Sequence, residues 1–132
     1  MKWGLDTSFI IRLLTGDPPA QAQAAAAWLA ELRSTGERPL VSDLVVAETY
    51  FALQSGYQVP KTAAIAALRD FLNSGDVEAV GAASEVLRTA NLATAKPGLV
   101  DRLIHAAYAE QQACLITFEK AARKLPKARV LS

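Results

Sequence analysis

The chain has one cysteine and one histidine among its 132 residues. A single cysteine cannot form a disulfide within the chain, and one cysteine with one histidine cannot build a Cys/His zinc site. Cys114 stands in the apolar stretch Ala113-Cys114-Leu115-Ile116, so we predict a buried structural thiol. The scarcity of both residue types excludes disulfide-rich scaffolds and zinc modules.

Long hydrophobic runs and a strong charge of either sign are also missing. No stretch of about 18 apolar residues is present, so we expect no membrane span. Asp6 interrupts the apolar N-terminal stretch, so we expect no signal peptide, and a reducing cytoplasm fits the cysteine usage. The net charge is +1, so any nucleic-acid binding must come from a local basic patch.

What the chain does contain is enough apolar sequence for a real core. Its residues are 52% hydrophobic and 20% charged, which is typical of a globular domain and not of a disordered tail. The length fits one domain, which we place at residues 1–132.

Strand and helix patterns alternate along the whole sequence. Strands are predicted at 2–5, 38–42, 76–81, 114–118 and 128–132. Helices are predicted at 7–14, 19–34, 43–55, 60–74, 83–94 and 99–113, with a helical turn at 119–125. Gly56 is expected just past the end of the third helix. The alternation predicts an α/β fold with a mostly parallel sheet and helices on both faces.

Polar residues follow two of the predicted strands. Asp6 comes directly after the first strand, and Thr117-Phe118-Glu119 ends the fourth. Ligands of such folds bind outside the carboxyl ends of the strands, so these residues are candidates for one shared site. Asp6 is also a favoured helix N-cap residue, and at this point both roles are open.

Glu48 breaks an apolar helical pattern. Its neighbours three and four residues away are Leu44, Val45, Phe51 and Ala52, so we expect it on the core-facing side of its helix. A carboxylate there is costly without a partner and suggests a functional role. The alternative is an edge position that reaches solvent or pairs with an arginine.

Asp101 lies in the first turn of its predicted helix, where the helix dipole favours an acid, so a structural role is equally open. His105, one turn later, is expected to pack and not to act. Taken together, Asp6, Glu48, Asp101 and Glu119 would repel one another unless a cation lay between them. Hard oxygen ligands with room for water suit Mg²⁺ or Mn²⁺.

Four stretches carry a resemblance to a known family. They are LDTSFIIRLL, VSDLVVAETYFAL, GLVDRLIHAAYAE and CLITFEKAARKL. In order and spacing they resemble the PIN-domain ribonucleases, and among these the VapC-type toxins of bacterial and archaeal toxin–antitoxin pairs. The resemblance implies a single-domain three-layer α/β/α sandwich with an acidic pocket for Mg²⁺ or Mn²⁺. It also implies an RNA substrate, a homodimer and a small cognate antitoxin.

The resemblance assigns roles to individual residues. Asp6, Glu48 and Asp101 correspond to the first three acids of the family's pocket, and the Thr7 and Thr117 hydroxyls match positions that order it. The fourth acid of the family follows Thr-Phe and is usually aspartate, whereas this chain has Glu119. One extra methylene carries its carboxylate about 1.5 Å further, so it would hold metal directly or through a water.

The resulting hypothesis is metal-assisted hydrolysis of an RNA phosphodiester. Asp6, Asp101 and Glu119 would be metal ligands, with Asp6, Glu48 and Asp101 catalytic. Attack by a metal-activated water, held or oriented by Glu48, would leave a 5′-phosphate and a 3′-hydroxyl.

Basic residues lie close in sequence to these acids and would offset their repulsion of phosphate. The candidates for RNA binding are Arg12, Arg102, Lys120, Arg123 and Lys124. The alternative for the C-terminal group is a solvated basic face.

Two other functional classes were weighed. An inactive PIN-like module that binds RNA or protein would result if Glu119 had spoiled metal binding. A haloacid-dehalogenase-type phosphatase needs a second aspartate where this chain has Ser8, and a receiver domain needs an early acid pair where Leu5 precedes Asp6. Both phosphoryl-transfer folds are therefore disfavoured.

Overall fold

The computed structural model describes all residues, 1–132, and contains the predicted alternation of helices and strands. The α-helices are α1 (Thr7–Thr15), α2 (Pro19–Ser34), α3 (Asp43–Tyr57), α4 (Lys61–Leu72), α5 (Ala83–Val86) and α6 (Leu99–Glu110). The strands are β1 (Leu40–Ser42), β2 (Glu78–Val80), β3 (Leu115–Thr117) and β4 (Ala128–Val130), with a short 3-10 helix η1 at Lys120–Lys124. The predicted α/β class is confirmed.

All strand pairing is parallel, but it is divided between two small sheets. In one, β1 pairs with β2, and Val41 lies opposite Ala79. In the other, β3 pairs with β4, and Ile116 lies opposite Arg129. Of the strand predicted at residues 2–5, only a single parallel bridge from Gly4 to Leu40 forms.

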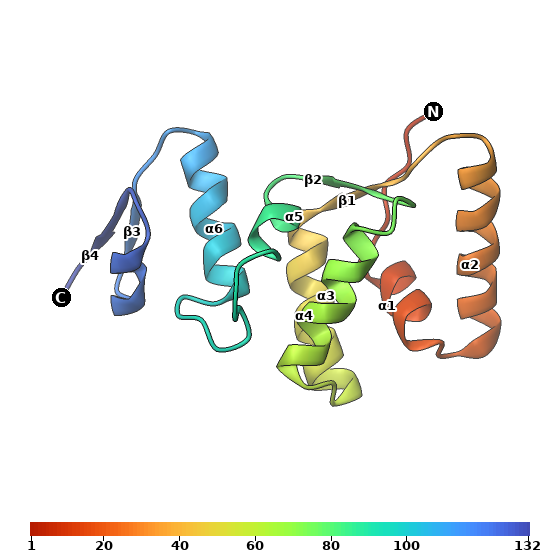
Figure 1. Ribbon diagram of the computed structural model, residues 1–132, viewed down its shortest axis with the longest axis horizontal. Coiled ribbons are helices and arrows are strands. Elements are labelled where there is room, and N and C mark those ends of the chain that lie inside the picture. The colour runs from red at the N-terminus through yellow and green to blue at the C-terminus, as the bar shows by residue number, and fades with distance from the viewer.

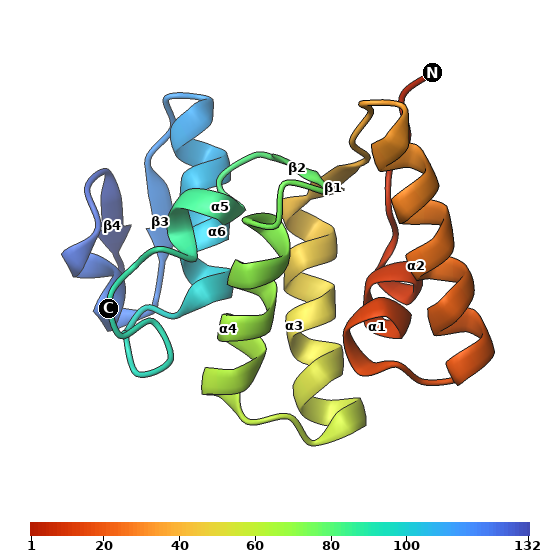
Figure 2. The same cartoon turned by 45° about the vertical axis from the view of Figure 1, so that its right-hand side comes forward.

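The two sheets lie apart: β1 and β2 lie beside the central helices, whereas β3 and β4 lie at one end of the molecule (Figures 1 and 2). Helices α3 and α4 occupy the middle, with α1, α2 and the N-terminus to one side and α6, β3 and β4 to the other (Figures 1 and 2). α6 packs on α5 and α3 and carries β3 on its other side. The strands that end at Asp6 and at Thr117 are therefore not neighbours in one copy of the chain.

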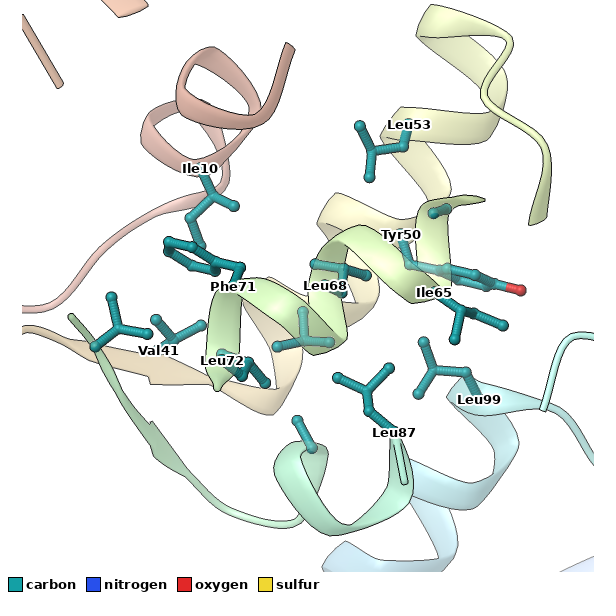
Figure 3. Packing of buried hydrophobic residues seen from close by; sticks show 14 of the residues in the cluster. Ile10, Val41, Tyr50, Leu53, Ile65, Leu68, Phe71, Leu72, Leu87 and Leu99 are labelled. Carbon is teal, nitrogen blue, oxygen red and sulfur yellow. The ribbon is translucent and has the colours of Figure 1, made fainter. Parts of the chain in front are cut away.

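One hydrophobic core holds the helices together. It contains 19 buried residues between Leu5 and Leu103, drawn from all six α-helices, from β1 and from the segments between them (Figure 3). Leu87 and Leu99 point toward α4, so the core fixes the start of α6 (Figure 3). Beyond Leu103 only Ala122 is buried, so the β3–η1–β4 segment adds almost nothing to this core.

Two helix boundaries differ from the prediction. α3 continues through Gly56 to Tyr57 and is closed by Gln58 in the left-handed conformation, with φ of 57°. A non-glycine residue therefore makes the turn that we assigned to Gly56. The helix predicted at 83–94 ends at Val86, and turns follow, in which Asn91 has φ of 55°. These turns bury Leu87 and Leu92, which a continuous helix would place on different faces.

The cysteine prediction is wrong. Cys114 is exposed, because it precedes β3 in the part of the chain that lies outside the core. No helix has the length and apolarity that crossing a membrane requires.

Candidate active site

Asp6 lies where the N-terminal extended segment enters α1, and it caps that helix. Its Oδ1 accepts hydrogen bonds from the Phe9 N–H at 3.1 Å and from the Ser8 hydroxyl at 2.8 Å. These bonds, the one from Phe9 first, lower the pKa of Asp6 below its ordinary value. The other oxygen of the same carboxylate, Oδ2, makes no hydrogen bond. Asp6 can therefore cap α1 through Oδ1 and still bind a ligand through Oδ2.

The structure corrects the position of Glu48. The buried face of α3 carries Val46 and Leu53, whereas Glu48 shares the opposite, exposed face with Leu44 and Phe51. Leu44 is 78% exposed and Phe51 is 55% exposed. The prediction of a core-facing Glu48 is therefore wrong, since the apolar stripe around it is not part of the core.

A hydrogen bond connects Glu48 to Thr7, the residue that follows Asp6. The Thr7 hydroxyl donates to Glu48 Oε1, which ties the first turn of α1 to the middle of α3. Asp6 directly precedes Thr7 in the chain, so this bond ties Glu48 to the segment that carries Asp6. We call Asp6 and Glu48 the first acidic pair.

Asp6 also borders a hollow of about 470 Å³ between α1 and α2. Arg12 lines the same hollow, and its Nε donates to Gln21 Oε1 at 2.6 Å. Trp28 forms the far wall and meets the edge of Phe9, with ring centroids 5.7 Å apart. One cation and one carboxylate therefore face a common open space.

Asp101 and Glu119 form the second acidic pair. Asp101 lies in the first turn of α6, and Glu119 immediately precedes η1. Both line a cavity of about 590 Å³ and an adjoining one of about 270 Å³. The Thr117 hydroxyl accepts a hydrogen bond from the Glu119 N–H at 3.0 Å, which fixes the turn that leaves β3.

The two pairs do not meet within one copy. No three acidic, histidine or cysteine side chains are grouped so that they could hold a metal ion, and neither Asp6 nor Glu48 lines the cavities of Asp101 and Glu119. The carboxylate oxygens suit a hard divalent cation in kind. Each acidic pair offers only two carboxylates, which is fewer than the three metal ligands that the sequence predicts.

The comparison with protein families supplies the assignment. Residues 5–128 match the PIN domain family, a span that contains both acidic pairs. The chain belongs to the PIN domain family. A PIN domain generally indicates nuclease activity, and such nucleases are typically metal-dependent hydrolases. No curated protein and no solved structure shows a significant match to this chain.

The basic residues of this PIN domain differ in how they are held. Arg102 donates from Nε to the Pro97 carbonyl at 2.7 Å, so its guanidinium is fixed beside the start of α6. Lys120, Arg123 and Lys124 are exposed on η1 and form no ion pair. They follow Glu119 directly, which places free positive charge next to the second acidic pair.

The sequence did not predict two residues that line the cavity of the second acidic pair. Lys61 lines the 590 Å³ cavity with Asp101 and Glu119 and adds a cation from the start of α4. Tyr50 lines it too, and burial raises the pKa of its hydroxyl. No local sequence pattern marks Tyr50 or Lys61 as a site residue. Both reach the cavity only because α3 and α4 pack against the segment before α6. His105 hydrogen-bonds the Pro126 carbonyl at 2.5 Å, as expected of a packing residue.

Proposed function

We propose that the chain is a divalent-metal-dependent endoribonuclease that acts as the toxin of a toxin–antitoxin pair. The observation that carries this proposal is the first acidic pair in a chain of the PIN domain family. Asp6, with Oδ2 free, and Glu48 are linked through Thr7 at the carboxyl end of an extended segment. Ligands of parallel α/β folds bind at this position.

The chemistry of the substrate explains why carboxylates need a partner. A phosphodiester is an anion, so acidic side chains alone would repel it. A divalent cation would supply neutralising charge and an activated water. Asp6, Asp101 and Glu119 are the proposed ligands, and Glu48, steadied by Thr7, orients the attacking water. The products would be a 5′-phosphate and a 3′-hydroxyl.

The distribution of cations supports a phosphate backbone as the ligand. Arg12 faces the hollow of Asp6, and Lys61 faces the cavity of Asp101 and Glu119. The three exposed cations of η1 extend the positive charge beyond that cavity. Each acidic pair thus has a basic neighbour, which would contact phosphates on either side of the scissile bond.

The toxin role rests on the resemblance of the four ordered stretches to VapC-type toxins. In this proposal a small antitoxin inhibits the enzyme by inserting a lysine or arginine among the carboxylates, where it replaces the metal. The negative charge of the two acidic pairs favours such a cation, as it favours Mg²⁺ or Mn²⁺.

The test is cleavage of a cellular RNA pool, including tRNA, with Mg²⁺ or Mn²⁺ and then with a chelator. We expect the wild type to cut with either metal, and Asp6→Asn to be slower by at least about a hundredfold. A single-stranded DNA of matched length distinguishes RNA from DNA specificity. Equal rates for wild type and Asp6→Asn would show that the site is wrong. Absence of both RNA cleavage and Mn²⁺ binding in calorimetry would favour the binding-module alternative.

A further inference from the structure

An aromatic side chain stands uncovered on the wall of the 590 Å³ cavity. Phe51 lines this cavity and is 55% exposed. Its ring lies against that of Tyr50, which is only 6% exposed, with the centroids 5.7 Å apart and an angle of 50° between the planes. A buried ring therefore supports an exposed one, and the open face of Phe51 can stack on a flat ligand.

Polar groups lie beside this aromatic pair. Figure 3 shows the ring of Tyr50 beside Ile65, with its hydroxyl directed away from Phe71 and Ile10. Burial raises the pKa of this hydroxyl and Gln54 partly opposes the shift, so the group keeps its proton at neutral pH and can donate. Gln54 Nε2 donates to the Tyr50 carbonyl at 3.1 Å, and Gln54 Oε1 makes no hydrogen bond. The cavity wall thus offers a donor and an acceptor, as the edge of a nucleobase requires.

Two lysines bring positive charge to the same cavity. Lys61 begins α4, and Lys96 lies in the segment before α6. Both are exposed and neither forms an ion pair, so both are free to bind a phosphate as point charges. The volume of about 590 Å³ lies within the range of roughly 300–1,000 Å³ found for sites of small ligands. An aromatic surface, hydrogen-bonding groups and cations together match the base and the phosphate of a nucleotide.

The cavity also places such a nucleotide beside the acids of the proposed site. Asp101 and Glu119 line the same cavity. Glu48 stands three residues before Phe51 on α3, and side chains at this spacing on a helix are neighbours. A base stacked on Phe51 therefore shares its cavity with the second acidic pair and has Glu48 one helical turn away. Binding of the base would hold the adjoining phosphodiester near these carboxylates.

Other occupants use less of the cavity. An apolar peptide would cover the ring of Phe51 but leave both lysines without a partner. A small inorganic anion would meet the lysines but not the aromatic surface. In an RNA duplex the bases are stacked on each other, so only an unpaired nucleotide can present the face of its base to Phe51.

We propose that this cavity binds one unpaired nucleotide of the RNA, next to the phosphodiester that is cut. Phe51 stacks on the base, and Gln54 with the Tyr50 hydroxyl contacts its edge. Lys61 and Lys96 bind the phosphate. The choice of RNA is thereby separated from hydrolysis, which belongs to the carboxylates. RNA as the source of the nucleotide rests on the proposed function, whereas a site for a nucleotide does not.

Binding is measured first, in EDTA and at low salt, so that the RNA stays intact. Fluorescence anisotropy compares fluorescein-labelled 12-mers of A, C and U with an abasic ribose-phosphate chain of the same length and charge. We expect the best of the three 12-mers to bind at least about tenfold more tightly than the abasic chain, because only the 12-mer can stack. Equal affinities, or no binding of any 12-mer, overturn the proposal.

Substitutions on α3 assign the effect to the cavity. Phe51→Ala should weaken binding of the best 12-mer by about tenfold and leave the abasic chain unchanged, as expected for the loss of one stacked base. Phe51→Trp keeps an aromatic face and should keep the affinity. Leu44→Ala is the matched control, because Leu44 is 78% exposed on the same face of α3 but does not line the cavity. No loss in Phe51→Ala, or an equal loss in Leu44→Ala, overturns the proposal.

The polar contacts have their own readouts. Gln54→Leu should reduce the differences in affinity among the A, C and U 12-mers by about tenfold while the abasic chain binds as before. Lys61→Gln should weaken all four chains alike and reduce the dependence of log affinity on log salt by about 0.7. Lys2→Gln, at the exposed N-terminus, is the control and should change neither quantity. Unchanged base preference in Gln54→Leu together with an unchanged salt slope in Lys61→Gln overturns the assigned contacts.

Competition and cleavage separate this proposal from its rivals. AMP, CMP and UMP lack neighbouring phosphates and should displace little of an equimolar 12-mer, whereas full displacement would show a site for a free nucleotide and overturn the proposal. With Mn²⁺, Phe51→Ala should raise KM for RNA cleavage about tenfold with little change in kcat. If the wild type does not cut RNA but binds it through Phe51, the proposed function fails and the nucleotide site stands. If Phe51→Ala cuts RNA with the KM of the wild type, the nucleotide site fails and the proposed function stands.

Discussion

The hydroxyl of Thr7 donates a hydrogen bond to Glu48 Oε1, and these residues are 41 positions apart in the chain. This bond connects the residue after the helix-capping acid to an exposed acid on another helix. Its value to folding is small because the bond lies at the exposed surface. Its value to the site is orientation, since an exposed glutamate otherwise samples many rotamers.

Removal of the Thr7 hydroxyl should therefore lower activity more than stability. Thr7→Val keeps the shape of the side chain, and we expect RNA cleavage to fall by about tenfold or more, as for other groups that orient a metal-site residue. Thermal unfolding should change little. Thr7→Ser restores the donor and should retain most of the activity. A Thr7→Val enzyme as active as wild type would show that the bond has no positioning role.

The two tasks of Asp6 can be separated by substitution. Asp6→Ala removes the cap of α1 and should lower the free energy of unfolding by about 1 kcal/mol in urea titrations. Asp6→Asn keeps an oxygen that can accept from the Phe9 N–H, so it should unfold close to wild type. Both variants should lose RNA cleavage. If Asp6→Asn were as unstable as Asp6→Ala, charge and not capping would stabilise the helix.

The pH dependence of stability should carry the signature of Asp6. Its pKa is lowered from 3.8 in the folded chain, so the ionised carboxylate contributes stability that is fully present above pH 3.8. That contribution is lost as the pH falls through the lowered pKa. The difference in unfolding free energy between wild type and Asp6→Ala should therefore shrink below pH 3.8. A difference that stays constant from neutral pH to acid would contradict this.

Thr49 offers a way to stabilise the protein. Its side chain is fully buried on α3, and its hydroxyl has no hydrogen-bond partner. Thr49→Val replaces that hydroxyl with a methyl group of similar size and should raise the free energy of unfolding by about 1 kcal/mol. Thr49→Ser keeps the hydroxyl and removes a methyl group, so it should destabilise. A Thr49→Val protein less stable than wild type would indicate a partner for the hydroxyl, such as a buried water.

Apart from the strand at 2–5, which forms a single bridge, and the shortened helix after Ala83, the order and type of the elements followed from the sequence, because apolar periodicity and Gly or Pro boundaries are local properties. The face of α3 that is buried could not be predicted in the same way. Val46 and Leu53 form one apolar face, and Leu44 and Phe51 form another around Glu48. Periodicity marks both faces equally, and only the packing of α3 against α1 and α4 decides between them.

Local sequence patterns could not predict which strands pair with each other either. The sequence predicted strands that end at Asp6 and at Thr117, and both positions do follow extended segments. Which strand lies next to which depends on contacts between distant parts of the chain. The convergence of Asp6, Glu48, Asp101 and Glu119 in one site therefore remains a prediction.

The core ends at Leu103, and this has a consequence for synthesis of the chain. Chains fold from the N-terminus during synthesis, so the central helices can begin to pack before the β3–η1–β4 segment joins the fold. Glu119 is added only after every core residue is in place. The second acidic pair, Asp101 with Glu119, is therefore completed only after the core that positions Asp101.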